Sequence, residues 1–544
     1  VLVRDLTTGL EFQPADLRLA DDPDEDEEDD DYLAEQQERL FDVVRLDKER
    51  QEAREDEDKA EQEADLTRPP LPFFLGEKQQ IRQASLSPDG RLMLVVLNKE
   101  KIDRGKRDSM PNYVTASGYV ESREVRSKVG TGKPSTDKLI LLDLQSHERH
   151  DLDLSVLPEI AGDPLEAVRE ANAANDEEGD DDGDEEGSPE IEADTAEEGS
   201  AEDEEDSEPE PRPVSIWNIE WTDNGARVAF QAHSSDNKDR WIATVDLATR
   251  EVVPQHHLHD PAWINWRYND FGWLPDSATL WYLSEETGYS HLYLRTPGQE
   301  ARALTAGEYE VSSPHVTLEG DAIYYVANDL HPGRYEVHRF NLRNGASDRL
   351  TDLGGMNRYV LSPDEQSLLL THSTTTRPPE LWIQPAEAGA EARQLTFTTS
   401  DEFLGRTWIE PEIVPIPSTH HDRPIYSRAY DAVGPTPLEG SDKRPAVVFI
   451  HGAGYLQNAH MGWSGYFREY MFHNLLARLG YVVLDMDYRA SAGYGRDWRT
   501  AIYRQMGWPE VEDLRDGVDW LVANKNVDRG RVGVYGGSYG GFLT

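Results

Sequence analysis

Between about residue 80 and residue 400, the chain repeats a pattern of polar turns and short apolar segments. Each turn is rich in Pro, Asp and Gly, and two short apolar segments follow it. Segments such as 139–144, 241–247 and 292–294 are apolar or β-branched and are bounded by turn residues, so they predict β-strands. The repeated turns are Ser87-Pro88-Asp89-Gly90, Trp221-Thr222-Asp223-Asn224-Gly225, Trp273-Leu274-Pro275-Asp276-Ser277, Leu318-Glu319-Gly320-Asp321 and Leu361-Ser362-Pro363-Asp364-Glu365.

The turns recur at a nearly constant spacing. Asp223 and Asp276 are 53 residues apart, and the steps from Asp276 to Gly320 and from Gly320 to Asp364 are 44 residues each. A period of roughly 40–50 residues with several strands in each unit predicts a β-propeller. The step from Asp89 to Asp223 is 134 residues, which we expect to hold an acidic insertion and two further strand-bearing units. Glu285-Glu286, beside Gly288, is either a turn or a group that binds a substrate amine.

Beyond about residue 405 the pattern changes to strands that alternate with helices. It begins with a predicted hairpin, and the last predicted strand comes just before the end of the chain. Alternating strands and helices predict a parallel α/β sheet. The expected elements are strands over 412–417, 425–430, 445–450, 481–486 and 531–535, and helices over about 464–479 and 510–524.

The net charge of −52 is concentrated in two segments. Residues 21–31 contain ten acidic residues out of eleven, and residues 176–211 contain 21 out of 36. Charge repulsion and few apolar residues predict disorder for both, within insertions over about 21–70 and 160–212. They are solvated insertions or, alternatively, calcium-binding or histone-like docking tails. This sign of charge argues against nucleic-acid binding.

Residues 33–66 have the pattern of a long, mostly exposed helix. Its apolar residues fall on one face, and Pro69-Pro70 follows it. The apolar residues are Leu33, Leu40, Phe41, Val44 and Leu46.

Length and composition limit the classes of protein that fit. A chain of 544 residues is expected to form at least two domains. It contains no cysteine, which excludes disulfides, thiolate metal sites and a cysteine nucleophile. It has no apolar run of about 18 residues, so we expect no membrane span. Because Val1 lies inside a strand-like phrase, we expect the true N-terminus to be missing, which leaves the compartment open.

The most specific motif is Gly536-Gly537-Ser538-Tyr539-Gly540, near the end of the chain. It follows a predicted strand and fits the G-x-S-x-G nucleophile elbow, a strained strand-to-helix turn that exposes its serine above a sheet. A serine hydroxyl also needs a base and donors for the oxyanion that develops during attack. We therefore predict Ser538 as the nucleophile and the backbone N–H of Tyr539 as one oxyanion donor.

The second oxyanion donor is expected in the loop after the strand over 445–450. That loop reads His451-Gly452-Ala453-Gly454-Tyr455, so His451, Gly452 and Gly454 are its candidate residues. The base cannot be assigned, because in this kind of site an acid and then a histidine follow the serine, and only Phe542, Leu543 and Thr544 come after Gly541. We expect these two groups to lie beyond the chain given. His473 lies in an apolar helix phrase and is expected to be structural.

A propeller followed by Gly-Gly-Ser-Tyr-Gly-Gly resembles the prolyl oligopeptidase family of serine peptidases, most closely its dipeptidyl peptidase IV-like branch. The resemblance is carried by residues 487–495, 508–513 and the elbow, in this order. It implies a β-propeller over 1–404 followed by residues 405–544 as an incomplete α/β-hydrolase domain, truncated after the elbow. It further implies an enzyme that cleaves short peptides, with the propeller as a size filter.

The resemblance also implies which residues act. Ser538 matches the nucleophile and Tyr539 the oxyanion amide, and neither metal nor cofactor is implied. Where the branch has a tyrosine hydroxyl as second oxyanion donor, this chain has His451, so a loop amide, His451 itself or Tyr455 must replace it. The branch's pair of glutamates for the substrate amino terminus is replaced by a single Glu77, which puts strict dipeptide release in doubt.

Three functional hypotheses remain open from the sequence. The first is a serine peptidase that acts through an acyl-enzyme on Ser538, with a peptide substrate and with a homo-oligomer left open. The second is an esterase or acyl-peptide hydrolase on the same scaffold, and the third is a non-catalytic propeller that binds partners. The fragment itself is expected to be inactive because it lacks the base. The resemblance leans towards a periplasmic or secreted bacterial enzyme.

Overall fold

The computed structural model describes residues 2–4, 6–21, 45–46, 49–50, 53–54, 57, 69, 71–166, 168–169, 172, 211–437, 439–452 and 455–544. These residues form two compact units, Val1–Pro261 and Ala262–Thr544. The division falls inside the segment predicted as propeller, and the predicted domain boundary at 404/405 stays a prediction. None of the described helices is long and apolar enough to cross a membrane.

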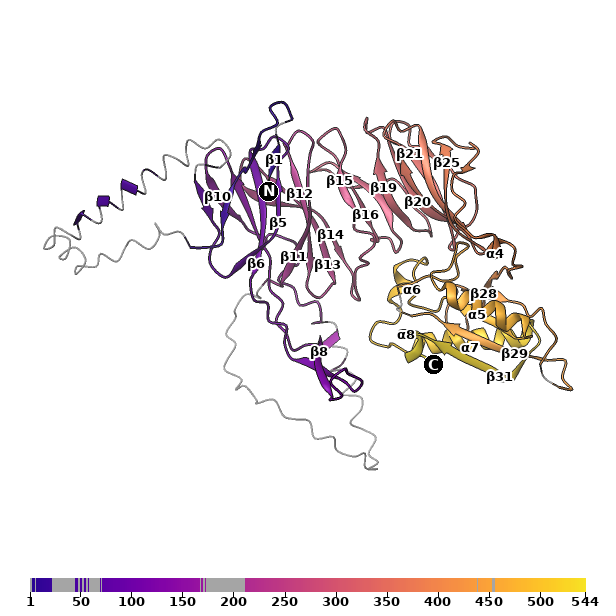
Figure 1. Ribbon diagram of the computed structural model, residues 1–544. Helices are drawn as coiled ribbons and strands as arrows, with labels where there is room; N and C mark the ends of the chain where they lie inside the picture. The colour runs from indigo at the N-terminus through magenta and orange to yellow at the C-terminus, as the bar shows by residue number, and fades with distance from the viewer. Residues whose placement is uncertain are drawn as a thin grey trace. The chain divides into compact units, whose positions relative to one another are not determined.

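The first unit is built mainly from two four-stranded antiparallel sheets (Figure 1). The facing sides of these sheets share one apolar core, which includes Leu94, Leu141, Phe230 and Trp241. The first sheet contains β5 (Gln79–Leu86), β6 (Leu92–Lys99), β9 (Lys138–Asp143) and β10 (Glu148–Leu152). The second contains β11 (Val214–Trp221), β12 (Val228–Ser234), β13 (Asp239–Asp246) and β14 (Glu251–His259).

Three short strand pairs complete the first unit. Two of them, β1 (Val3–Arg4) with β2 (Glu11–Phe12) and β3 (Asp16–Arg18) with β4 (Pro72–Phe74), precede the first sheet. The third pair, β7 (Arg107–Asn112) with β8 (Glu121–Ser127), is a hairpin inserted between β6 and β9 of that sheet. The described residues between Asp89 and Asp223 contain no complete additional four-stranded group, so they do not bear out the expectation of two further strand-bearing units. The described residues there hold β6, β9, β10, β11 and this hairpin.

The second unit begins with three further groups of four strands. The first group forms its own sheet, and the other two are joined by a single parallel bridge between Tyr335 and Met356. The groups are β15 (Phe271–Trp273), β16 (Leu280–Ser284), β17 (His291–Arg295) and β18 (Arg302–Ala303); β19 (Val311–Val316), β20 (Ala322–His331), β21 (Arg334–Asn341) and β22 (Ser347–Arg349); and β23 (Met356–Leu361), β24 (Ser367–Thr374), β25 (Arg377–Pro385) and β26 (Arg393–Gln394).

The repeated turns of the sequence occupy one structural position. Each joins the first and second strands of a four-stranded group. In each turn the N–H of one residue donates to the carbonyl of the residue three before it. This donor residue has a positive φ, between 54° and 72°, in all five turns: Gly90, Gly225, Ser277, Gly320 and Glu365. The predicted repeat is therefore confirmed as a four-stranded, blade-like unit. Within the described residues of either unit, the sheets do not close into a ring.

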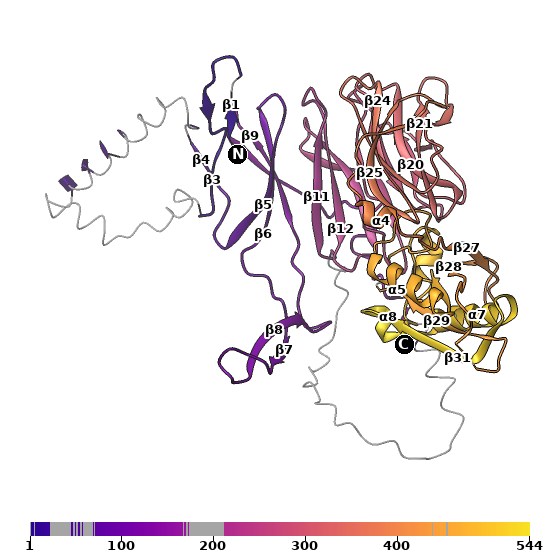
Figure 2. The same ribbon diagram turned by 45° about the vertical axis from the view of Figure 1, so that its right-hand side comes forward.

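The rest of the second unit is a mixed sheet with helices, as expected for the start of an α/β-hydrolase domain (Figures 1 and 2). The strand order is β27-β28-β30-β29-β31, and the pairs β30–β29 and β29–β31 are parallel. The strands are β27 (Glu412–Ile416), β28 (Ile425–Tyr430), β29 (Arg444–Ile450), β30 (Val482–Met486) and β31 (Val527–Gly536). The helices are α4 (Asp401–Leu404), α5 (Phe467–Arg478), α6 (Arg496–Thr500), α7 (Trp508–Asn524) and α8 (Tyr539–Phe542).

The predicted elements beyond residue 405 are confirmed to within a few residues. The short helix α6 was not predicted. Of the helix expected over 33–66, the described residues 45, 46, 49, 50, 53, 54 and 57 are helical. The remainder of that helix lies outside the described residues, and so do the two acidic segments except for Asp21 and Pro211.

The left-handed residue of the repeated turns leads to one prediction about stability. Ser277 adopts φ 54°, a left-handed conformation that costs a residue with a Cβ atom about 1 kcal/mol or more. Ser277→Gly removes this strain and loses about 0.5 kcal/mol to the greater entropy of unfolded glycine, so we expect a net gain of roughly 0.5 kcal/mol in the free energy of unfolding. Equilibrium urea unfolding measures the change.

Gly90 provides the reciprocal variant. It has φ 72°, and an added Cβ atom would meet nothing within 4 Å, so Gly90→Ser introduces backbone strain without a steric clash. We expect it to lower the free energy of unfolding. If both substitutions changed the free energy of unfolding by the same amount and in the same direction, backbone strain at this turn position could not be the cause.

Candidate active site

Ser538 lies at the sharp turn between β31 and α8. Its backbone has φ 55° and ψ −119°, a conformation that residues with a Cβ atom rarely adopt. Such strain costs on the order of 1–3 kcal/mol and is concentrated at functional sites. The carbonyl of Ser538 accepts hydrogen bonds from the N–H groups of Gly541 (2.9 Å) and Phe542 (3.1 Å), which start the helix. Ser538 therefore has the strand–turn–helix setting that a nucleophile elbow requires.

Two glycines of the motif are required by packing against the neighbouring strand. A Cβ atom on Gly536 would lie 2.6 Å from the carbonyl oxygen of Ile450, the last residue of β29. A Cβ atom on Gly540 would overlap the same oxygen. By contrast, a Cβ atom on Gly537 would meet nothing within 4 Å. The first and last glycines of the motif thus let α8 pass close to the end of β29.

The glycine loop after β29 contacts the elbow through Gly452. A Cβ atom on Gly452 would lie 3.0 Å from the carbonyl oxygen of Gly537 and 3.4 Å from Cβ of Ser538. The N–H of Gly452 donates to the Tyr466 hydroxyl at 2.9 Å. The sequence-predicted Gly452 and Ser538 are therefore neighbours, whereas Gly454 lies outside the described residues and the side chain of Tyr455 is exposed.

The imidazole of His451 is buried and hydrogen-bonded at both nitrogens. Nδ1 lies 2.9 Å from the carbonyl oxygen of Gly452, so Nδ1 carries the proton. Nε2 then accepts from the hydroxyl of Ser491, also at 2.9 Å, and the ring stacks on Tyr488 at 4.5 Å. Burial lowers the pKa of His451, which favours the neutral ring. His451 thus acts as a fixed neutral support within the loop.

Two buried aspartates hold this loop to the end of β30. Asp487 accepts hydrogen bonds from the N–H groups of Asn458 (2.7 Å) and Ala459 (2.9 Å) and from the hydroxyl of Tyr494 (2.7 Å). Asp485 accepts both of its bonds from the Asn458 side chain. Burial raises the pKa of Asp487 to about 6. Both acids lie at the end of an apolar strand segment, and this position is the signal in the sequence that marks them.

Ser491, His451 and Asp487 have the composition of a catalytic triad but not its geometry. Asp487 Oδ1 lies 3.5 Å from Nε2 of His451, the same nitrogen that faces Ser491. In a working triad the serine and the acid contact opposite nitrogens of the imidazole. Ser491 is also fully buried, so no substrate can reach it. The three residues form a structural network.

The remaining candidate histidines are engaged away from Ser538. Nε2 of His473 lies 2.7 Å from the hydroxyl of Tyr535, and Nδ1 of His460 lies 3.1 Å from the N–H of Gly462. Among the described residues, no histidine ring hydrogen-bonds the Ser538 side chain. The phenol of Tyr539 donates to Glu510 at the start of α7, which anchors the residue after the nucleophile. The oxyanion role of the Tyr539 N–H stays a prediction.

Glu285, one of the two adjacent glutamates, forms a buried ion pair. Its Oε2 lies 2.8 Å from Nη2 of Arg499 in α6, and both side chains are almost completely inaccessible. The N–H of Gly288 donates to the Glu285 carbonyl, which closes a turn. These contacts favour the turn interpretation of Glu285-Glu286.

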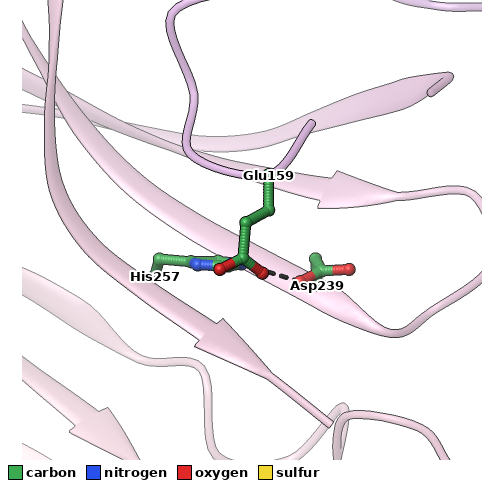
Figure 3. A group of neighbouring side chains, drawn as sticks. All are labelled: Glu159, Asp239 and His257. Atoms are coloured by element: carbon green, nitrogen blue, oxygen red, sulfur yellow. Dashed lines mark hydrogen bonds and ion pairs between the residues drawn. The ribbon is translucent and has the colours of Figure 1, made fainter. Parts of the chain in front are cut away.

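A separate cluster in the first unit has residue types that could bind a metal. Glu159, Asp239 and His257 offer ligand atoms within 4.8 Å of one another (Figure 3). However, Arg212 donates to Asp239 Oδ2 at 2.7 Å, while His257 and His259 approach Oδ1 at 2.7 and 2.9 Å. The guanidinium already supplies a cation to this carboxylate, so Asp239 is better explained as the buried centre of an ion-pair network with Arg212, His257 and His259.

This network predicts a pH dependence of stability. Burial alone would raise the pKa of Asp239, but hydrogen bonds from His257, Arg212 and His259 outweigh it and lower the pKa to about 2. A lowered pKa stabilises the folded protein above pH 4, and this contribution is lost as the pH falls towards 2. The stability advantage of the wild type over Asp239→Asn should shrink by about 1 kcal/mol between pH 5 and pH 3, measured by urea unfolding. A constant difference would contradict this.

Comparison with known proteins shows that two segments of the chain are similar to peptidases. Residues 194–379 match the dipeptidyl peptidase IV N-terminal region, and residues 469–544 match the prolyl oligopeptidase family. The crystal structure of Porphyromonas gingivalis dipeptidyl peptidase 4 has a similar fold, with a TM-score of 0.62 and 19% identity over 85% of this chain and 56% of that chain. The likeness fits a propeller followed by part of an α/β-hydrolase domain.

The curated relatives with similar sequences are also peptidases or related enzymes. The chain is 32% identical over 197 residues to the uncharacterized peptidase YuxL of Bacillus subtilis, covering 35% of this chain and 27% of that protein. It is 27% identical over 346 residues to mouse dipeptidyl peptidase 8, covering 57% of this chain and 36% of that protein. It is 26% identical over 218 residues to the acylamino-acid-releasing enzyme of Sus scrofa, covering 39% of this chain and 29% of that protein. These matches support a relationship to the prolyl oligopeptidase family and to its dipeptidyl peptidase IV-like branch. The matches cover well under half the length of these relatives.

The packing of the elbow glycines can be tested with a matched pair of substitutions. Gly540→Ala places a methyl group against the Ile450 carbonyl and should cost roughly 1–3 kcal/mol of stability, because the backbone must shift. Gly537→Ala adds the same methyl group to open space and should cost much less. Urea unfolding of the two variants measures the difference. Equal losses of stability in the two variants would show that the contact with the Ile450 carbonyl does not require glycine at position 540.

Proposed function

We propose that the protein is a serine peptidase that hydrolyses short peptides through an acyl-enzyme on Ser538. The observation that supports this most is the left-handed backbone of Ser538 between β31 and α8, with Gly452 packed against it. A strained serine in this setting, in a family of peptidases, is best explained as a nucleophile.

The reaction would take place in two steps. The hydroxyl oxygen of Ser538 attacks the peptide carbonyl while a base takes its proton, and the tetrahedral intermediate expels the amine, which takes up that proton. Water then hydrolyses the ester by the reverse sequence of proton transfers. In both steps the N–H of Tyr539 is the proposed donor to the oxyanion, with a second donor from the side of Gly452.

The base is proposed to come from residues outside this sequence. None of the histidines in the described part of the chain hydrogen-bonds the Ser538 side chain, and His451 is fixed by Ser491 and Gly452. Residues 1–544 alone should therefore show little peptidase activity, because loss of a triad member lowers the rate by several orders of magnitude. The family resemblance supports three further proposals. The blade-like sheets would filter substrates by size, the protein would form a homo-oligomer, and it would work outside the cytoplasm.

A second candidate is the release of acylated amino acids from peptides. It is favoured by the similarity to an acylamino-acid-releasing enzyme and by the single glutamate, Glu77, where the branch has a pair. Turnover of peptide amides with a free amino terminus, compared with their N-acetylated forms, separates the two candidates.

Labelling of the full-length protein by a fluorophosphonate tests the proposed nucleophile. We expect covalent labelling of the wild type and its loss in Ser538→Ala, because the reagent bonds to an activated serine oxygen. Ser491→Ala is the informative control, since Ser491 is the serine that hydrogen-bonds His451. This variant should still be labelled. Labelling that survives in Ser538→Ala but is lost in Ser491→Ala would overturn the assignment.

A further inference from the structure

The engagement of His451 leaves the second oxyanion donor unassigned. Both nitrogens of its ring are used within the buried network, and its ring stacks on Tyr488. The N–H of Gly452 is also engaged, because it donates to the hydroxyl oxygen of Tyr466. A group that stabilises an oxyanion must instead present a free proton beside the nucleophile.

The hydroxyl of Tyr466 lies beside the nucleophile. The position that a Cβ atom on Gly452 would occupy is 3.2 Å from this hydroxyl oxygen and 3.4 Å from Cβ of Ser538. The two side chains therefore border the same small space, which Gly452 leaves open because it has no side chain. A substrate carbonyl attacked by Ser538 would bring its oxygen to this side of the elbow.

The hydrogen bonds of Tyr466 leave its proton available. The hydroxyl oxygen accepts from the N–H of Gly452 at 2.9 Å, and a phenol has one proton of its own to donate. No acceptor for that proton is found among the described residues. An accepted hydrogen bond polarises the phenol and strengthens it as a donor.

The ring of Tyr466 is also held in place before any substrate binds. It packs edge to face on Phe449 of β29, with centroids 5.3 Å apart. The backbone N–H of Tyr466 donates to Ser464 Oγ at 3.0 Å, and the Ser464 hydroxyl donates to the side chain of Asn458. Asn458 in turn donates to Asp485. Tyr466 precedes α5, and its carbonyl accepts the N–H of Tyr470 at 2.9 Å. A donor fixed in advance costs no reorganisation during the reaction.

We propose that the hydroxyl of Tyr466 is the second oxyanion donor, with Gly452 positioning it. This inference depends on the proposed function of Ser538. It gives the role to a residue outside the glycine loop, fifteen positions after His451. In the tetrahedral intermediate, the former carbonyl oxygen would accept from Tyr466 Oη–H and from the N–H of Tyr539, while the N–H of Gly452 continues to donate to Tyr466.

The test compares Tyr466→Phe with Tyr481→Phe in the full-length protein, using a peptide amide substrate. Tyr481 is half-buried and directly precedes β30, the central strand, at the end opposite to the loop after Ile450, and it serves as the matched control. We expect Tyr466→Phe to lower kcat by about 10²–10³-fold with little change in KM, because the lost bond forms only in the transition state. It should also weaken a boronate inhibitor, which mimics the intermediate, by a similar factor. Tyr481→Phe should change neither.

A more acidic phenol separates a catalytic from a structural role. With 3-fluorotyrosine at position 466, kcat should fall at alkaline pH as the phenol ionises, because a phenolate cannot donate to an oxyanion. The same kcat for wild type and Tyr466→Phe, with both labelled at Ser538, would overturn this inference and leave the proposed function intact. A wild type that is not labelled at Ser538 would overturn both. If Tyr466→Phe fails to fold, the fluorotyrosine profile decides, and an unchanged profile overturns the inference.

Discussion

The carbonyl oxygen of Ile450, at the end of β29, occupies the space where side chains on Gly536 and Gly540 would otherwise lie. Because β31 pairs with β29 as far as Ile450 and Gly536, the chain must leave the sheet immediately afterwards. Only Gly537 separates the strand from Ser538, so the serine takes up the sharp change of direction in its own backbone. The same strand end leads into the loop that carries Gly452. One close backbone contact therefore determines the positions of the proposed nucleophile and of the loop beside it.

The buried aspartates keep that arrangement in place at a cost in stability. Asp487 is fully buried, and burial raises its pKa to about 6, so the folded protein binds its proton more tightly than the unfolded chain does. Its contribution to stability therefore decreases as the pH rises from about 4 to about 6. Two backbone N–H groups and a tyrosine hydroxyl partly offset this penalty at neutral pH. Functional sites commonly retain groups that order the site while they reduce overall stability.

Local patterns in the sequence predict most of the fold. The turns could be found because a left-handed residue after Asp or Asn, as in four of the five, or a glycine, as in the fifth, has a strong compositional signal. The strand β29 could be found because it is apolar from Pro445 to Ile450. The hairpin β7–β8 was not predicted, since its strands are exposed and lack alternation. At the candidate site, the motif identified Ser538 and Gly452. Tyr466 could not be found, because its relation to Ser538 depends on a contact across 72 positions of sequence and not on any local pattern.

The inserted hairpin has a consequence for the order in which the first sheet can form. In the second sheet, residues 235–238 connect β12 to β13, whereas residues 100–137 separate β6 from β9. By chain entropy alone, closing the longer connection costs about 2 kcal/mol more. The hairpin shortens the effective connection, because β7 and β8 pair locally and Lys128 N–H bonds to the carbonyl of Lys106. Once the hairpin has formed, only residues 100–106 and 128–137 remain to be closed, so the insertion can fold first and bring the two central strands of the sheet together.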